Sequence, residues 1–401
     1  MKGRMTAAGA GAITLDDRPL DKDAAISTAQ PCIAPAQIAL SAVTDLAAIG
    51  PRWRALEARS DASFFQSWTW VGCLAEQRFP DPLLLEVRQD GQDVALALFN
   101  RHETWLSSCT LRLGESGVAA LDAMFVEHNG LLLAQGRADL LAPCLRFLLR
   151  PRPGLRLVLA GVDGAHLDAA RATDGAVVRV LRTEPAPFVD FTQLADGPDG
   201  FVASLGASTR YQLRRSARRY GEGGRLAVRR AQSVDEAHAM LDELAPLHQA
   251  TWTSRGQPGA FANPKFREFH QALIASGLPR GEIDLLRITA GEQLIGCLYN
   301  FCYGGAVLTY QSGFDYAASQ PHQKPGMTCH HMAIEMYRAA GWRRYDFLAG
   351  QDRYKTSLAN AATTLHWIDM VPRWSLRGVL TRLRRAVLKT IAFQRNSATG
   401  Y

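Results

Sequence analysis

The chain has 401 residues, of which 47% are hydrophobic, and a formal net charge of +7. That length and apolar content allow a large core and favour two lobes over one small domain. Seven scattered cysteines without a C-x-x-C pair are typical of reduced thiols in a cytoplasmic compartment. The absence of G-x-S-x-G, G-x-x-x-x-G-K-[ST] and H-E-x-x-H motifs argues against hydrolase, NTPase and zincin chemistry.

The first 35 residues are rich in alanine, glycine and small polar side chains, which is typical of a disordered leader. Residues 36–185 then show strand patterns at 83–88, 93–100 and 155–161, with a helix expected over 137–149. This half contains no good phosphate-binding turn. We therefore expect an α+β lobe that is structural or helps to form an acceptor cleft.

The second lobe, expected over residues 186–370, begins with a helix that carries clustered arginines behind Ser208 or Thr209 as N-cap. Several of them are four residues apart and repel one another unless an anion compensates. A phosphate-bearing ligand or a merely solvated basic helix would both fit this pattern. The cluster consists of Arg210, Arg214, Arg215, Arg218 and Arg219.

Three strands are predicted next, at 283–289, 294–303 and 306–313, and they form an antiparallel meander. A turn with the spacing Q-x-x-G-x-T follows, then a helix over 327–340 and a strand over 342–348. A glycine at a helix start lets an anion approach backbone N–H groups and the positive end of the helix dipole. The turn therefore predicts a phosphate-binding loop at Gln323, Lys324, Gly326, Met327 and Thr328.

This strand, turn, helix and strand order resembles the central unit of GNAT-type acyltransferases, which hold coenzyme A pyrophosphate at such a loop. An N-acyl transfer by direct attack needs a base for the amine, donors for the oxyanion and an acid for the leaving thiolate. Asp315, after the third strand, is the first candidate for the base, and His330 is another. Lys355 is a candidate for oxyanion stabilisation, and Tyr354 lies where GNAT enzymes commonly place a tyrosine acid.

The chain also resembles the CelD/BcsL cellulose-biosynthesis acetyltransferases, which are related to Fem-type aminoacyl transferases. The matching pieces occur in the family's order from about residue 45 to 360: FFQSWTW, LRRSARRYGEGG, LHQATWTSRGQPGAF, YQSGFD, PGM and YDFLAGQDRYK. The resemblance implies a fold of tandem GNAT-like lobes, each a mostly antiparallel sheet flanked by helices. It also implies an acceptor pocket lined by Trp252, Arg255 and Phe261, to which we add Tyr310 and Asp346 from the adjoining strands.

Residues 371–401 form the last predicted unit, a basic amphipathic helix and tail. Apolar residues recur at helical spacing between 376 and 391 among arginines and lysine, so the helix can dock on the protein core or lie on an anionic membrane.

We expect an acyl-CoA-dependent N-acyltransferase that uses acetyl-CoA or another acyl-CoA and modifies an amino group of a polysaccharide or envelope precursor or a related small molecule. Two alternatives remain. The acyl donor could be aminoacyl-tRNA, the one reading in which nucleic acid is a partner, or the chain could be a non-catalytic GNAT-like module of a polysaccharide-synthesis complex. The expected location is cytoplasmic, with peripheral contact at the inner membrane face through the C-terminal helix. No metal site is expected.

Overall fold

The computed structural model describes residues 35–103, 109–122, 125–150, 154–197 and 199–383. The described residues from 36 to 383 belong to one compact unit. The predicted leader therefore lies almost entirely outside the described residues. Of the predicted C-terminal helix, residues 376–383 are helical, and residues 384–401 lie outside the described part.

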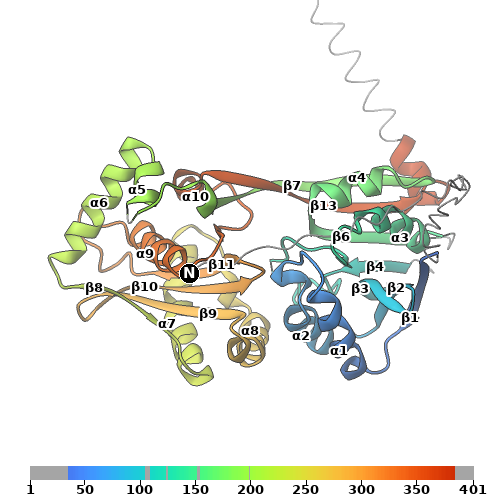
Figure 1. Cartoon of the computed structure of the whole chain (residues 1–401), viewed down its shortest axis with the longest axis horizontal. Helices are drawn as coiled ribbons and strands as arrows, with labels where there is room; N and C mark the ends of the chain where they lie inside the picture. The colour runs from blue at the N-terminus through green and yellow to red at the C-terminus, as the bar shows by residue number, and fades with distance from the viewer. Residues whose placement is uncertain (1–34, 104–108, 123–124, 151–153, 198, 384–401) are drawn as a thin grey trace, which may run out of the picture. The chain divides into compact units, whose positions relative to one another are not determined.

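In the first half of the chain, two helices precede a run of three antiparallel strands, β2, β3 and β4 (Figure 1). In chain order its elements are β1 (Gln37–Ala42), α1 (Leu46–Glu57), η1 (Phe64–Gln66), α2 (Trp68–Arg78), β2 (Pro82–Gln89), β3 (Gln92–Glu103), β4 (Cys109–Leu113), β5 (Leu132–Leu133), η2 (Ala138–Leu140), α3 (Leu141–Leu148), β6 (Arg156–Val162), α4 (Gly164–Arg171) and β7 (Ala176–Asp190).

The second half repeats this order of elements after two further helices, α5 and α6, and its helices are longer except for α10. Its elements are η3 (Phe191–Gln193), α5 (Gly200–Ser204), α6 (Ala207–Gly221), β8 (Leu226–Arg230), α7 (Val234–Ser254), η4 (Ala260–Ala262), α8 (Pro264–Gly277), η5 (Leu278–Arg280), β9 (Ile283–Ala290), β10 (Gln293–Tyr303), β11 (Ala306–Phe314), α9 (Pro325–Ala339), β12 (Arg344–Asp346), α10 (Arg353–Leu358) and β13 (Ala361–Pro372).

The strands form one sheet in the order β1-β2-β3-β4-β6-β13-β7-β12-β11-β10-β9-β8, with β5 beside β3. Each half is antiparallel except for one parallel pair, β4 with β6 and β11 with β12. We call β1–β6 the first lobe and β8–β12 the second lobe. The two strands between them are exchanged, because β7 follows β6 in sequence but pairs with β12, whereas β13 follows β12 but pairs with β6. The fold is therefore α+β with tandem GNAT-like lobes, as predicted.

Both faces of the sheet are buried, which follows from strands that are apolar at consecutive positions. In β9, Leu285 packs into the core shared with α1, α2, α7 and α8, whereas Leu286 and Ile288 pack on the opposite face with α6 and α9. The shared core joins the two lobes. Phe64 of η1 stacks on Phe301 of β10 with ring centroids 4.1 Å apart.

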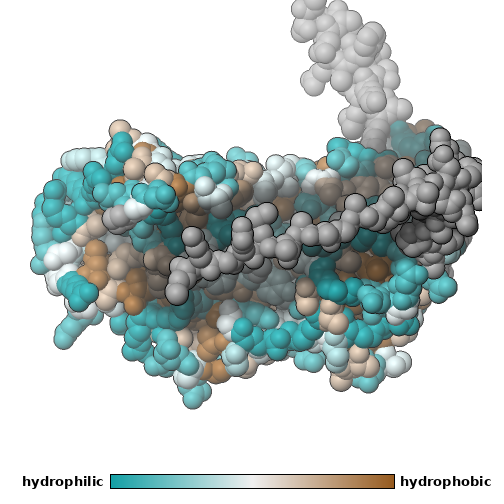
Figure 2. All heavy atoms as spheres, in the orientation of Figure 1, coloured by the Kyte–Doolittle hydropathy of each residue, from teal (hydrophilic) through white to brown (hydrophobic). Residues whose placement is uncertain are grey.

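The predicted boundary at residues 185/186 falls inside β7. Another detail differs from expectation: Gly206, and not Ser208 or Thr209, is the N-cap of α6. The visible surface is mostly hydrophilic with separate small hydrophobic areas (Figure 2). Among the described residues, no helix is both long enough and apolar enough to cross a membrane.

Candidate functional site

The site lies where β11 and β12 separate. The two strands pair in parallel only over Ala306–Leu308 and Arg344–Asp346. Beyond these residues β11 continues to Phe314 against β10, while the chain after β12 turns away at Leu348, which has a φ of 60°. The divergence leaves one side of β11 open toward α9 and α10.

A cavity of about 1330 Å³ occupies this opening, and we call it the central cavity. Its volume exceeds the roughly 300–1,000 Å³ that is usual for a small-molecule site, so it has room for two substrates side by side. Its walls come from β11, α6, α7, α9, α10 and one segment of the first lobe. Side chains that the argument uses are Glu127, Trp252, Arg255, Tyr310, His330 and Lys355.

The N-terminus of α9 opens into the central cavity. Pro325 is its first residue and has no N–H, and the first helical bond runs from Thr328 N to Lys324 O (3.0 Å). The backbone N–H groups of Gly326 and Met327 have no acceptor among the described residues, and both residues line the cavity. A side chain at position 326 would obstruct this corner, because a Cβ there would lie 3.2 Å from the Phe314 ring. Free amides at a helix start are suited to bind phosphate.

Ser216 of α6 fixes the position of this loop. Its buried Oγ accepts a hydrogen bond from Lys324 N (2.7 Å) and bonds to Thr328 Oγ1 (2.8 Å). Thr328 is fully buried and does not line the cavity. Thr328 was predicted as part of the cofactor-binding loop. Its backbone N–H is bonded to Lys324 O and its side chain joins α9 to α6, so Thr328 supports the loop and does not face the cavity.

Positive charge surrounds the same corner. Lys324 is exposed and lines the cavity. Partial desolvation and the nearby charges of Arg215, Arg219 and Lys324 lower the pKa of His322. Two arginines of the predicted cluster thus lie near the loop. Gln323 does not line the cavity; its Oε1 accepts from Gln320 N (2.6 Å), so it shapes the turn.

Two of the predicted catalytic side chains are stacked at the cavity wall. The rings of His330 and Tyr354 lie 5.3 Å apart at 12°. His330 Nδ1 bonds to the Tyr345 hydroxyl (3.0 Å), and its Nε2 has no partner among the described residues. Burial and then the charge of Lys355 lower the pKa of His330 to about 3, so the ring is neutral at physiological pH. Burial raises the pKa of Tyr354, which keeps its proton for donation.

Lys355, the residue after Tyr354, is almost fully buried and also lines the cavity. Its Nζ donates to the Ala349 carbonyl (2.7 Å) and more weakly to that of Leu348 (3.4 Å). Burial lowers the pKa of Lys355, and the nearby carboxylates of Glu127 and Asp352 partly oppose that shift. A buried ammonium group beside an open cavity is suited to stabilise a developing negative charge.

Two predicted carboxylates lie elsewhere. Asp315, the first candidate for a base, caps a turn by accepting from Ala318 N (2.9 Å) and does not line the central cavity. Asp346 is fully buried, accepts from Leu348 N (2.8 Å) and lies 3.2 Å from His128 Nε2. Both expectations are corrected, because these carboxylates are already used to hold the backbone around the site.

Of the predicted acceptor residues, Trp252, Arg255 and Tyr310 line the central cavity. Phe261 does not, because it packs edge-on against Phe266 (5.1 Å) and His248 (5.3 Å) beneath the cavity wall. Its side chain belongs to the hydrophobic core, since aromatic rings bury most of their area.

Two of the titratable residues that line the cavity, His248 and Glu127, were not singled out from the sequence. His248 of α7 is held between the Ser312 carbonyl (3.1 Å, through Nδ1) and Ala260 N (3.3 Å, through Nε2). Glu127 comes from the first lobe, is 5% exposed and accepts a hydrogen bond from Ala349 N. The signal for Glu127 was a polar Glu-His-Asn group inside the otherwise apolar stretch FVEHNGLLL.

The fold and this divergence between parallel strands define a GNAT-like protein. Consistent with that class, residues 207–356 match the family model described as an acetyltransferase (GNAT) domain. The chain therefore carries a GNAT-type acetyltransferase domain in its second half. None of the curated proteins matches the chain.

Two solved structures, FemX and a protein of unknown function, support the fold over most of the length. A crystal structure of FemX is 10% identical with a TM-score of 0.58, and the match covers 86% of this chain and 99% of FemX. A conserved protein of unknown function from Bacteroides thetaiotaomicron is 10% identical with a TM-score of 0.54, over 84% and 100% of the two chains. A tandem GNAT protein from the clavulanic acid biosynthesis pathway matches at 13% identity and a TM-score of 0.42, over 83% and 98%.

Proposed function

We propose that the protein is an acyl-CoA-dependent N-acyltransferase that acts on an amino group of a polysaccharide or envelope precursor or a related small molecule. The observation that carries the proposal is the N-terminus of α9. Its two unengaged amides, at Gly326 and Met327, face an open cavity where two parallel strands diverge. Such a corner suits the pyrophosphate of a nucleotide-linked thioester.

The resemblance to CelD/BcsL-type acetyltransferases supports the same reading. Its motifs are far apart in the sequence, yet four of the six contribute to the wall of the central cavity, through Trp252, Tyr310, Gly326 and Tyr354. A motif set that served only to fold the lobes would have no reason to converge on one opening.

The side chains at the cavity are suited to acyl transfer. When bound, acyl-CoA supplies an activated thioester. The amides of Gly326 and Met327, with Lys324 beside them, would hold its phosphates. Lys355 is suited to stabilise negative charge on the acyl oxygen, and Tyr354, with a raised pKa, is suited to protonate the departing thiolate.

The non-catalytic alternative predicts an obstructed pocket, and the open central cavity argues against it. The aminoacyl-tRNA alternative shares the fold, since FemX is similar over most of the chain. The free amides at α9 favour coenzyme A, because a phosphate loop is the feature that distinguishes the two donors.

Titration calorimetry with acetyl-CoA and longer acyl-CoAs tests the proposal. In Gly326→Trp, the indole fills the corner and removes access to both amides. Two charge-assisted hydrogen bonds are worth about 1.5 kcal/mol or more each, so affinity should fall about 100-fold or further. Gly221→Trp places the same side chain at the end of α6, where nothing lies within 4 Å, and should bind normally.

Unchanged affinity in Gly326→Trp would place the donor elsewhere. No heat from any acyl-CoA with the unaltered protein would refute acyl-CoA as donor. Transfer from aminoacyl-tRNA would then be measured to distinguish a Fem-like transferase from a binding module.

A further inference from the structure

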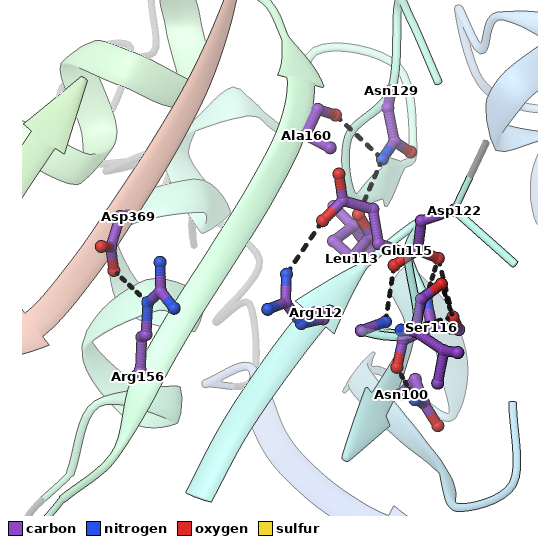
Figure 3. Close-up of polar contacts among 12 residues, drawn as sticks. Asn100, Arg112, Leu113, Glu115, Ser116, Asp122, Asn129, Arg156, Ala160 and Asp369 are labelled. Atoms are coloured by element: carbon purple, nitrogen blue, oxygen red, sulfur yellow. Dashed lines mark hydrogen bonds and ion pairs between the residues drawn. The ribbon is translucent and has the colours of Figure 1, made fainter. Parts of the chain in front are cut away.

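The first lobe has its own pair of diverging parallel strands, but its opening is filled. β4 and β6 pair over Thr110–Leu113 and Arg156–Leu159, as β11 and β12 do in the second lobe. Beyond that pairing Asn129 lies between the strands. Its Nδ2 donates to the Leu113 carbonyl (3.3 Å) and to the Ala160 carbonyl (3.1 Å), as Figure 3 shows.

The backbone around Asn129 completes the filling. Asn129 N donates to the Gly161 carbonyl (2.9 Å), and Asn129 bridges to Val162 as a parallel strand would. Gly161 has a φ of 63°, and a Cβ there would lie 2.2 Å from the Val126 carbonyl oxygen. Residues 126–130, which we call the wedge, therefore occupy in the first lobe the place that the central cavity has in the second lobe.

The wedge also reaches the second lobe. Glu127 accepts from Ala349 N, and His128, with a φ of 47°, places Nε2 3.2 Å from Asp346 Oδ2. A left-handed conformation at a histidine costs free energy and persists only where the surroundings enforce it. The wedge thus fills one lobe and presents a carboxylate in the cavity of the other.

Glu127 differs from the other carboxylate at the cavity. Among the described residues, Glu127 and Asp352 line it, and Asp352 is exposed whereas Glu127 is almost fully buried. Glu127 Oε2 is held by Ala349 N, while Oε1 accepts from none of the described residues. One oxygen fixes the side chain and the other is free to accept from a substrate.

Building on the proposed function, we propose that Glu127 forms the acceptor-binding site, where it receives the ammonium group of a primary amine and removes its proton. The first lobe therefore supplies the general base of the second. One proton passes from nitrogen to Glu127 and then to water. The nitrogen lone pair forms the C–N bond and the C–S bond breaks. Tyr354 gives its proton to the sulfur and is reprotonated by the second proton from nitrogen.

The environment of Glu127 fits this role. Burial raises its pKa, while the hydrogen bond from Ala349 and the charges of Lys355 and His128 oppose that shift, and the charge of Asp346 adds to it. A base with a pKa closer to the working pH transfers protons efficiently. Because the base must be ionised, the rate should rise as pH increases through the pKa of Glu127.

The test measures the release of free thiol from acetyl-CoA by the full chain between pH 5 and 9. Glucosamine, ethanolamine and lysine serve as probe amines. Glu127→Gln keeps the shape and the bond from Ala349. We expect its kcat to fall about 100-fold or more, with loss of the acidic limb of the pH profile and acetyl-CoA affinity within twofold. Glu127→Asp should regain part of the rate.

Glu115→Gln is the matched control, because burial also raises the pKa of Glu115, which pairs with Arg112 (3.0 Å) away from the cavity (Figure 3). It should leave kcat and the pH profile unchanged. Normal turnover in Glu127→Gln, or loss of acetyl-CoA binding in parallel with turnover, would overturn the proposal. So would acetyl-CoA binding by the unaltered protein without transfer to any probe amine. If the unaltered protein binds no acyl-CoA, the proposed function itself fails.

Discussion

The wedge makes a quantitative prediction through Asn129, which is 5% exposed. Asn129→Ala removes the buried donor that bonds to the Leu113 and Ala160 carbonyls. A hydrogen bond contributes about 0.5–1.5 kcal/mol, so the loss of two costs about 1–3 kcal/mol. The bonds measure 3.3 and 3.1 Å, slightly long for N–H···O, so we expect the lower half of that range.

The assay is urea unfolding followed by tryptophan fluorescence, with the loss of free energy taken from the shift of the midpoint. Asn360→Ala is the control: Asn360 also makes two hydrogen bonds to backbone, to Asp190 N (2.7 Å) and Asp190 O (3.1 Å), but it is exposed and water can replace them. We expect less than about 1 kcal/mol there. Equal destabilisation by the two variants would refute the reasoning.

Displacement of the wedge should also be visible in function. Asn129→Ala moves the segment that carries Glu127, but it leaves the N-terminus of α9 intact. Turnover should therefore fall while acetyl-CoA affinity stays within about twofold. An equal loss of turnover and affinity would contradict the view that acetyl-CoA and the amine bind at separate parts of the cavity.

Three further outcomes follow. Ser216→Ala should lose about 1–3 kcal/mol of stability and weaken acetyl-CoA binding, whereas Ser204→Ala, exposed on α5, should change neither; equal calorimetric affinities would contradict this. Lys355→Ala should lose about 1–3 kcal/mol of stability in urea unfolding, because it leaves two carbonyls without their donor. Its turnover, measured by thiol release, should fall at least about tenfold; wild-type turnover would remove Lys355 from the site. In the segment 373–383, Trp374 is 78% exposed and lies beside Arg373 and Arg382. The protein should therefore sediment with phosphatidylglycerol vesicles but not with phosphatidylcholine vesicles, and Trp374→Ser should reduce that binding. Equal binding to both lipids would argue against binding to an anionic surface.

Local chemistry predicted much of the second lobe. Runs of β-branched and aromatic residues between turns located β9, β10 and β11 to within one or two residues, and Pro325 with Gly341 bracketed α9. The expected strand at 342–348 is shorter, Arg344–Asp346, because the backbone at Leu348 turns to meet Lys355 and the wedge. That contact is between residues of different elements and leaves no periodic trace in the sequence.

The candidate site could be predicted only in part for the same reason. Gly326, His330, Tyr354 and Lys355 carry local signals, and all four line the cavity. Glu127 carries only the weaker signal of a polar group inside an apolar stretch, since its role depends on Ala349, which lies 222 positions away in sequence. Asp315 was misread because an aspartate after a strand has the same sequence pattern whether it caps a turn or faces a substrate.

The exchange of β7 and β13 has a consequence for how the protein could be divided. A chain cut after Asp190 would leave β12 without its neighbour on one side and β13 without either partner. Each half would then expose edge strands with unpaired backbone groups, which favour pairing between molecules and aggregation. We therefore expect the two halves to fold and unfold together, and neither half to be stable when it is expressed alone.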